Sequence, residues 1–187
     1  SDELVEFAEL ANAPVVSTLK GKGVFPESHP LFVGVRGDHV TKYLTESDVI
    51  FAVGSSLSPG RFSHGIPNAV SKTFVHCNIN ELHVNKAYPT EHAVIGDSKF
   101  VLKALIDEIK SSGNPIADSD KSKVHEEVKS AKDSGLAQYN EVMVSNETPI
   151  NPYRVYGDLM KTLDPKKSFV THESGNTRDQ LSTVYQT

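Results

Sequence analysis

Short uninterrupted apolar runs alternate with amphipathic segments along the first two thirds of the chain. The clearest run, at 49–54, predicts a strand buried on both faces, as in a parallel sheet, and the run at 73–79 predicts the next strand. Shorter runs at 14–18 and 93–97 predict two more strands. Apolar positions at helical spacing predict helices at 2–11, 40–45 and 99–111. Asp97 is the expected N-terminal cap of the helix at 99–111. This alternation indicates an α/β fold, a Rossmann-like parallel sheet flanked by helices.

The pattern changes after residue 112, which predicts a boundary. Residues 112–121 carry no apolar periodicity and are typical of a linker. A long charged helix with a solvated face is expected at 123–144, and Gly135 is a candidate break in it. From residue 150 a new unit begins, in which a helix is followed by a strand at 168–172. The expected organisation is a central unit at 1–112, a linker and charged helix at 113–148, and an incomplete third unit at 149–187.

Composition excludes several classes of protein. The chain has 187 residues and a formal net charge of −5, and it has no long basic stripe, which argues against a nucleic-acid surface. Mean hydropathy is −0.33, and no apolar run approaches the ~20 residues of a membrane helix. The single cysteine, Cys77, excludes an internal disulfide and fits a reducing compartment. We therefore expect a cytoplasmic globular chain that binds neither nucleic acid nor membrane.

Two glycine-containing loops follow predicted strands and are candidate ligand sites. The first is Gly21-Lys22-Gly23, and the second begins at Gly54-Ser55 and extends to Gly60. In open α/β sheets the loops at the carboxyl ends of strands carry the ligands, and glycine lets a phosphate approach the backbone closely. The lysine favours an anion at the first loop. A tight turn or a plain surface loop is the alternative interpretation of both.

The segment 14–37 carries a longer ordered motif. A strand of the form Pro-Val-x-x-Thr leads to Gly-Lys-Gly, Phe-Pro-Glu, His-Pro-Leu and a closing Gly-x-x-Gly. In this order the segment resembles the central domain of thiamine-diphosphate enzymes of the acetolactate synthase type. The matching residues are Pro14, Val15, Thr18, Gly21, Lys22, Gly23, Phe25, Pro26, Glu27, His29, Pro30, Leu31, Gly34 and Gly37. The third unit looks like the entry to the diphosphate-binding domain of the same family.

The resemblance implies a parent enzyme that uses thiamine diphosphate and Mg²⁺ to make or break a bond beside the carbonyl of a 2-keto acid. Acetolactate synthase, benzoylformate decarboxylase and oxalyl-CoA decarboxylase are the implied relatives, which are lyases or transferases that form homo-oligomers. The family's catalytic glutamate lies in a different domain, and Gly96-Asp97-Ser98 is not its Gly-Asp-Gly metal motif. The resemblance therefore implies a fragment, without the first strand of its central domain, that is inactive without the remaining domains.

The resemblance also implies two sets of cofactor contacts. In the family, acids at the end of the strand placed here at 73–79 read the ribose of FAD or ADP, but this chain has Asn78 and Asn80. These amides can bond a ribose, with Asp97 near the adenine, yet they favour an empty or weak nucleotide pocket. The residues expected near the diphosphate of thiamine diphosphate are Gly175, Asn176 and Thr177. Two alternatives stay open: a non-catalytic module that binds FAD, ADP or a coenzyme A nucleotide, and a structural central domain that supports oligomerisation.

Other chemistries that the sequence suggests are disfavoured. His172, Glu173 and Ser174 are adjacent, but neighbouring residues of a strand point to opposite faces, so they are not expected to form a hydrolase triad. The eight histidines show no metal-ligand spacing, so no zinc site is expected. Cys77 lies within a predicted strand, which favours a small core residue over a nucleophile.

Overall fold

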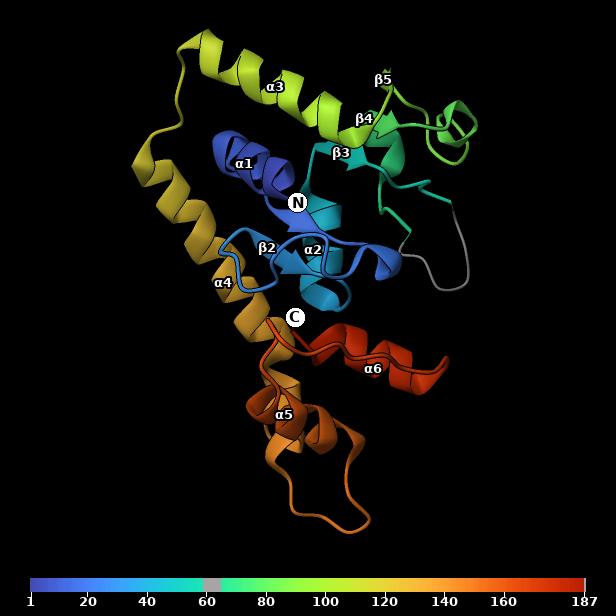
Figure 1. The fold of residues 1–187 in the computed structure, drawn as a ribbon, viewed down its shortest axis with the longest axis vertical. Coiled ribbons are helices and arrows are strands. Elements are labelled where there is room, and N and C mark those ends of the chain that lie inside the picture. The colour runs from blue at the N-terminus through green and yellow to red at the C-terminus, as the bar shows by residue number, and fades with distance from the viewer. Residues whose placement is uncertain (59–64, 187) are drawn as a thin grey trace.

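The computed structural model describes residues 1–58 and 65–186, and within this part all strands pair in parallel. β1 (Val15–Val16) pairs with β2 (Phe32–Gly34). The second sheet contains, in spatial order, β3 (Val49–Val53), β4 (Thr73–Asn78) and β5 (His92–Ile95). Helices flank both sheets (Figure 1). The expected α/β fold with parallel strands is confirmed, although the strands belong to two sheets instead of one.

Four helices pack around the sheets. α1 (Asp2–Ala11) lies along α3 (Ser98–Ser112). α2 (Asp38–Glu46) packs against β2 and against α4 (Asp118–Asn140). Figure 1 shows α4 running from the region near the far end of α3, past β2, to the C-terminal part of the chain. The helices expected in the first 112 residues are therefore all present.

The small sheet is the centre of the packed core. Successive side chains of β2 point to opposite faces and therefore enter two apolar clusters. Phe32 lies in a cluster with Ala8 of α1, whereas Val33 lies in a cluster with Val40 of α2 and Val128 of α4. Val128 is 0% exposed. The charged helix is therefore more than the expected linker, because its apolar stripe covers one face of this sheet.

Two details of the second half differ from expectation. α4 continues through Gly135 without the break that this glycine suggested. The strand expected at 168–172 was wrong: the segment is irregular, and Phe169 is 90% exposed. A strand needs a neighbour for its backbone groups, and none of the described strands pairs with this segment.

The C-terminal part contains α5 (Pro152–Thr162) and α6 (Asn176–Val184), which pack on each other. Their shared core is formed by buried residues of both helices and of the segment after α6, namely Tyr156, Leu181, Val184 and Tyr185. Sequence reasoning missed α6 and assigned its first residues to a loop. Figure 1 shows α6 below the small sheet, with the C-terminus close to α4.

β3 is less buried than its apolar sequence predicts. Val49 is 57% exposed, and Ile50, Phe51 and Val53 are half-buried. Within the described residues β3 pairs only with β4, and β1 pairs only with β2. The expectation of burial on both faces was wrong for this chain, because an unpaired strand edge leaves neighbouring side chains open to solvent.

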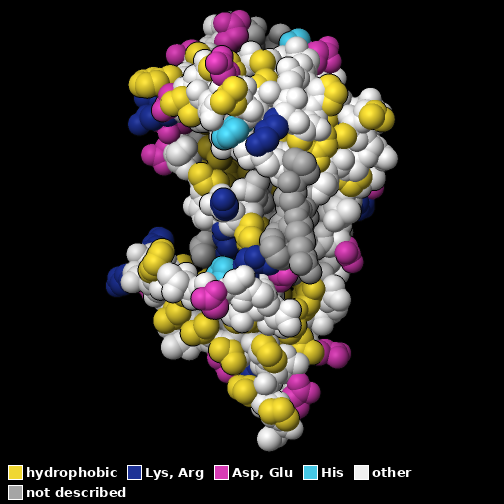
Figure 2. All heavy atoms as spheres, turned by 90° about the vertical axis from the view of Figure 1, so that its right-hand side faces the viewer, with side chains coloured by type: hydrophobic (Ala, Val, Ile, Leu, Met, Phe, Trp, Pro, Cys, Tyr) yellow, Lys and Arg dark blue, Asp and Glu magenta, His cyan; other side chains and the backbone are white. Residues whose placement is uncertain are grey.

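The segments that follow β1, β3 and β4 leave on one side of the molecule, the right-hand side of Figure 1. Thr18 and Gly54, which follow β1 and β3, and Asn78, the last residue of β4, belong to this edge. Figure 2 faces the same edge and shows lysine and arginine side chains around a hollow at mid-height. Pro59 and Gly60, which belong to the second candidate loop, lie outside the described residues.

Candidate functional site

The rim of the larger sheet is organised by the backbone carbonyl of Ser55. Its oxygen accepts hydrogen bonds from His76 Nε2 at 2.7 Å and from Asn78 Nδ2 at 2.9 Å. His76 is 1% exposed and Asn78 is 3% exposed. Because a carbonyl oxygen can only accept, Nε2 of His76 carries its proton. These two buried side chains of β4 fix the start of the loop that begins at Gly54.

The side chains predicted to read a nucleotide take part in local hydrogen bonds. Asn78 Oδ1 accepts from Asn80 N at 2.9 Å, and Asn80 Oδ1 accepts from Leu82 N at 3.0 Å. Asp97 Oδ1 accepts from Lys99 N at 2.8 Å, so the predicted cap of α3 is confirmed. A ribose would have to compete with these bonds. The nucleotide contacts of the three residues therefore stay predictions.

Gly54 brings the end of β3 close to the start of α3. Its φ is 66°, in the left-handed region that favours glycine, and a Cβ atom there would lie 3.4 Å from Ser98 Oγ. Burial raises the pKa of the Cys77 thiol in this region, which keeps it protonated. Cys77 is therefore a buried core residue, as predicted. This rim brings together the predicted residues Gly54, Ser55, Asn78, Asn80 and Asp97.

The lysine of the first candidate loop has a buried carboxylate partner. Lys22 Nζ lies 2.7 Å and 2.6 Å from the two carboxylate oxygens of Glu27 and donates to the carbonyl oxygen of Tyr185 at 2.7 Å. The side chains of Lys22 and Glu27 are 13% and 2% exposed. Thr18 Oγ1 accepts from Gly21 N at 3.1 Å and fixes the start of the loop. An anion at Gly21–Gly23 would compete with Glu27 for the lysine.

The residues predicted to approach a diphosphate form the start of α6. Gly175 is the N-terminal cap residue, with a φ of 91°, and as a glycine it offers no capping side chain. Gly175, Asn176 and Thr177 are all exposed. The first N–H groups of a helix have no intrahelical acceptor, and they attract anions. This end of α6 therefore fits phosphate groups.

A charged cluster near this helix start was missed by sequence reasoning. Arg36 Nη1 donates to Asp179 Oδ1 at 2.7 Å, and Arg178 Nε donates to the same oxygen at 3.0 Å. The hydrogen bond from Arg178 lowers the pKa of Asp179, and the charge of Arg36 acts in the same direction. The position of Arg36 between Gly34 and Gly37 was the only sequence signal, and the fold supplies a partner 143 residues away.

His39 is enclosed by glycines from two elements. It is 5% exposed, and a Cβ atom at Gly34, Gly37 or Gly135 would lie under 3.0 Å from its ring. No described residue hydrogen-bonds its Nδ1 atom. Burial lowers the pKa of His39, and the charge of Lys132 lowers it further, whereas Asp38 opposes the change. A neutral imidazole therefore joins α4 to the turn after β2.

A hollow of about 480 Å³ opens between α4 and the segment 28–30. Its lining carries charges of both signs. Lys129 pairs with Asp133, and His29 Nε2 lies 3.1 Å from Glu9 Oε1. Such a lining favours no single class of ligand.

The described residues, 1–58 and 65–186, contain no group of three or more histidine, cysteine, aspartate or glutamate side chains placed to hold a metal. No helix among them is both long and apolar enough to cross a membrane. In the 172–174 segment, His172 Nδ1 lies 3.0 Å from the Glu173 carbonyl oxygen, and Ser174 N donates to Glu173 Oε1 at 2.7 Å. These bonds are local and do not resemble a catalytic triad.

Comparisons with known proteins agree with the resemblance carried by 14–37. The family described as "Thiamine pyrophosphate enzyme, central domain" matches residues 1–105. A probable acetolactate synthase large subunit of Methanococcus aeolicus is 30% identical over 201 residues, which is 100% of this chain and 33% of the relative.

Two further relatives are also acetolactate synthase large subunits by name. A probable acetolactate synthase large subunit of Methanocaldococcus jannaschii is 30% identical over 199 residues, 100% of this chain and 32% of the relative. The acetolactate synthase large subunit of Corynebacterium glutamicum is 34% identical over 115 residues, 59% of this chain and 18% of the relative. The chain spans about a third of the length of the Methanococcus aeolicus and Methanocaldococcus jannaschii relatives.

Proposed function

Because this chain belongs to the thiamine pyrophosphate enzyme family, with residues 1–105 matching the central domain, we propose that its parent protein is a thiamine-diphosphate- and Mg²⁺-dependent enzyme. The proposed reaction makes or breaks a carbon–carbon bond beside the carbonyl of a 2-keto acid, as in an acetolactate synthase or a decarboxylase. The observation that carries this proposal is the similarity of the whole chain to two probable acetolactate synthase large subunits.

Within this chain, the start of α6 is the part that fits the cofactor. The exposed first turn at Gly175, Asn176 and Thr177, whose cap residue has no side chain, would bind phosphate oxygens through backbone N–H groups. Thiamine diphosphate supplies the electron sink for this chemistry when it is bound, and the protein binds and orients it. The remaining domains of the parent protein supply the catalytic glutamate and the metal motif in this proposal.

The test is calorimetric titration with thiamine diphosphate and Mg²⁺. We expect no tight binding by the 187-residue chain alone and tight binding by the parent protein. The parent protein should also consume a simple 2-keto acid such as pyruvate. A parent protein that binds no thiamine diphosphate would contradict the proposal.

A second candidate function, for the central unit alone, is a structural role without a nucleotide. It is supported by the local hydrogen bonds of Asn78, Asn80 and Asp97, which occupy the polar groups predicted to contact a ribose or adenine. We expect no thermal stabilisation by ADP and no yellow colour from FAD in the purified parent protein. Stabilisation by ADP, FAD or coenzyme A would favour the nucleotide-binding alternative.

We also propose the organisation of the parent protein. Residues 1–112 form most of its central domain, residues 113–148 a connecting segment with α4, and residues 149–187 the beginning of the diphosphate-binding domain. The parent works as a homo-oligomer in the cytoplasm, and the single buried thiol of Cys77 is consistent with that compartment.

A further inference from the structure

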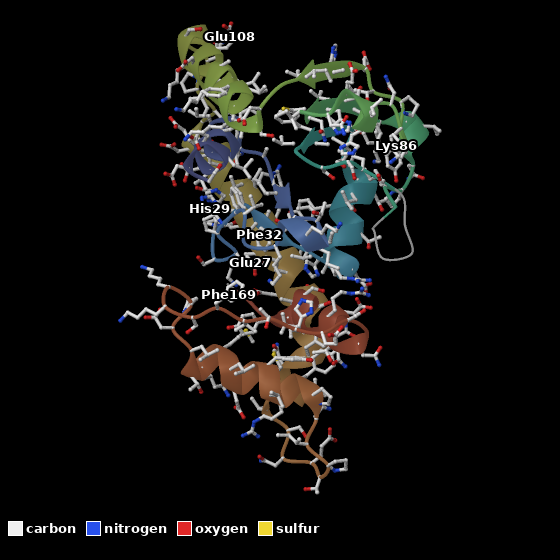
Figure 3. All side chains as sticks on the ribbon, turned by 45° about the vertical axis from the view of Figure 1, so that its right-hand side comes forward. Glu27, His29, Phe32, Lys86, Glu108 and Phe169 are labelled. Atoms are coloured by element: carbon white, nitrogen blue, oxygen red, sulfur yellow. The ribbon has the colours of Figure 1, made fainter. Side chains whose placement is uncertain are left out.

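Two cations from the edge of the small sheet contact the two ends of α6. Lys22, in the loop after β1, bonds the carbonyl oxygen of Tyr185, the C-terminal cap residue of α6. Arg36, in the turn after β2, pairs with Asp179 in the first turn of α6. Figure 3 shows Glu27, the partner of Lys22, at the boundary between the central unit and the C-terminal helices.

The Lys22 contact is built from buried groups. An ammonium group has three N–H donors, and this one has acceptors in both carboxylate oxygens of Glu27 and in the Tyr185 carbonyl. A cation beside the last carbonyls of a helix also interacts favourably with the helix dipole. Because Glu27 is nearly fully buried, leaving its charge unpaired would be costly. Lys22 is therefore held firmly, and it fixes the C-terminal end of α6.

The Arg36 contact fixes the other end. Asp179 accepts from both Arg36 and Arg178, so two guanidinium groups converge on one carboxylate oxygen. The Arg36 side chain is 25% exposed and that of Asp179 is 42% exposed, so this pair is more accessible than that of Lys22. An acid in the first turn also favours the helix dipole. The pair ties the first turn of α6 to the turn after β2.

α6 depends on such contacts because it is short. It has nine residues, and isolated helices of fewer than about 12 residues are marginal in water. Its apolar residues Leu181 and Val184 pack in the cluster shared with α5. The contacts of Lys22 and Arg36 therefore help to set how α6 is oriented relative to the central unit.

We propose that Lys22 and Arg36 are positioning residues for the cofactor loop. By holding both ends of α6, they keep the first-turn amides at 175–177 in the orientation that a diphosphate needs. Neither residue contacts the ligand; Lys22 acts through Tyr185, and Arg36 acts through Asp179. The identity of the ligand rests on the proposed function, whereas the clamp on α6 does not.

Hydrogen exchange of the backbone amides at 176–185 tests the clamp in the chain itself. One variant is Arg36→Met, and the other is the double variant Lys22→Met/Glu27→Gln, which removes both charges of the ion pair. Lys20→Met, an exposed lysine of the same loop, is the matched control. We expect about tenfold faster exchange in α6 for both variants and no change for the control. Unchanged exchange in both variants overturns the clamp.

Calorimetric titration of the parent protein with thiamine diphosphate and Mg²⁺ tests the positioning role. We expect Arg36→Met to raise the Kd about tenfold, which is about 1.4 kcal/mol, with the KM for the 2-keto acid unchanged at saturating cofactor. Arg36→Lys should restore part of the affinity because it keeps the charge. A wild-type protein that binds no cofactor overturns the proposed function and leaves the clamp intact. A wild-type protein that binds it, with an unchanged Kd in Arg36→Met, overturns the positioning role.

Discussion

His39 joins two segments that are distant in the sequence. It belongs to α2, yet its ring occupies the space beside Gly135 on α4. A glycine inside a helix costs about 1 kcal/mol relative to alanine. Here the glycine lets α4 approach the turn after β2, so helix propensity and packing have opposite preferences at this position.

The substitution Gly135→Ala should therefore destabilise the chain although it favours the helix. The added Cβ atom would overlap the His39 ring, and overpacking typically costs about 1–3 kcal/mol, which exceeds the gain in propensity. Urea denaturation measures the net change, with the exposed neighbour Ser134→Ala as control. In a His39→Ala background the same substitution should become stabilising. A stabilised Gly135→Ala single variant would show that the ring does not fill this space.

The stability of the chain should carry a pH dependence from His39. Burial lowers the pKa of His39 in the folded chain below its ordinary value of 6.5. As the pH falls below that value the unfolded chain binds the proton more readily, so the free energy of unfolding decreases, by up to about 1.4 kcal/mol per pH unit.

Denaturation of His39→Asn at about pH 5 and about pH 7 isolates this contribution, because the carboxylates of the chain titrate in both proteins. We expect the wild type to lose more stability than the variant between the two conditions. The exposed histidine variant His92→Asn should behave like the wild type. Equal losses in the wild type and His39→Asn would refute the assignment.

The sequence predicts the role of a residue when its partner is close by in the sequence, and it does not when the partner is distant. The role of Asp97 as a cap was predictable, because it bonds the amide of Lys99 two positions along. The basic loop suggested an anion site, but the fold places Lys22 against Glu27 and against Tyr185, 163 residues away. Neither the burial of Glu27 nor the position of Tyr185 can be read from a local pattern.

At the scale of single elements, α3 offers a direct test of what Asp97 does. Removing an N-terminal cap costs about 1 kcal/mol, so Asp97→Ala should destabilise the chain by that amount without any ligand. Glu108→Ala removes the same charge from the far end of α3 (Figure 3) and should change stability little. If Asp97→Ala leaves stability unchanged, the carboxylate has another role, and the nucleotide interpretation gains support.

Elements with strong local patterns were predicted well, and elements that depend on their surroundings were not. The sequence expectation for α1, at 2–11, and those for β3 and β4 agree with the structure. α6 was missed because Gly175 and Asn176 stand at its start and its apolar residues, Leu181 and Val184, lie only in its second half. The segment 168–172 has the composition of a strand, but none of the described strands pairs with it. Pairing, unlike periodicity, is a property of two segments.

At the scale of the whole molecule, the division into two sheets is the main departure from the expected architecture. β1 and β3 each pair on one edge only, among the residues described. A long apolar strand with an open edge is unusual in a soluble protein, because such edges recruit other strands. The contrast between the apolar sequence of β3 and its partial exposure indicates that a neighbour is needed beside it.

We predict that a strand from the part of the parent protein preceding α1 inserts between β1 and β3 and unites the two sheets. A strand there, followed by α1 and then by the parallel strand β1, makes the right-handed crossover that such connections adopt. A longer version of the chain that includes this segment should therefore melt at least about 5 °C higher. Its amides in β1 and β3 should also exchange more slowly with solvent.

The matched control carries prolines at alternate positions of the added segment, which remove the backbone donors that pairing needs. This control should melt and exchange like the 187-residue chain. If the longer chain gains no protection in β1 and β3, the two sheets are independent, and the partial exposure of Val49 is a property of the mature fold. If only the unmodified segment protects both strands, the open edges of β1 and β3 are the two sides on which one inserted strand pairs, and all the strands form a single sheet.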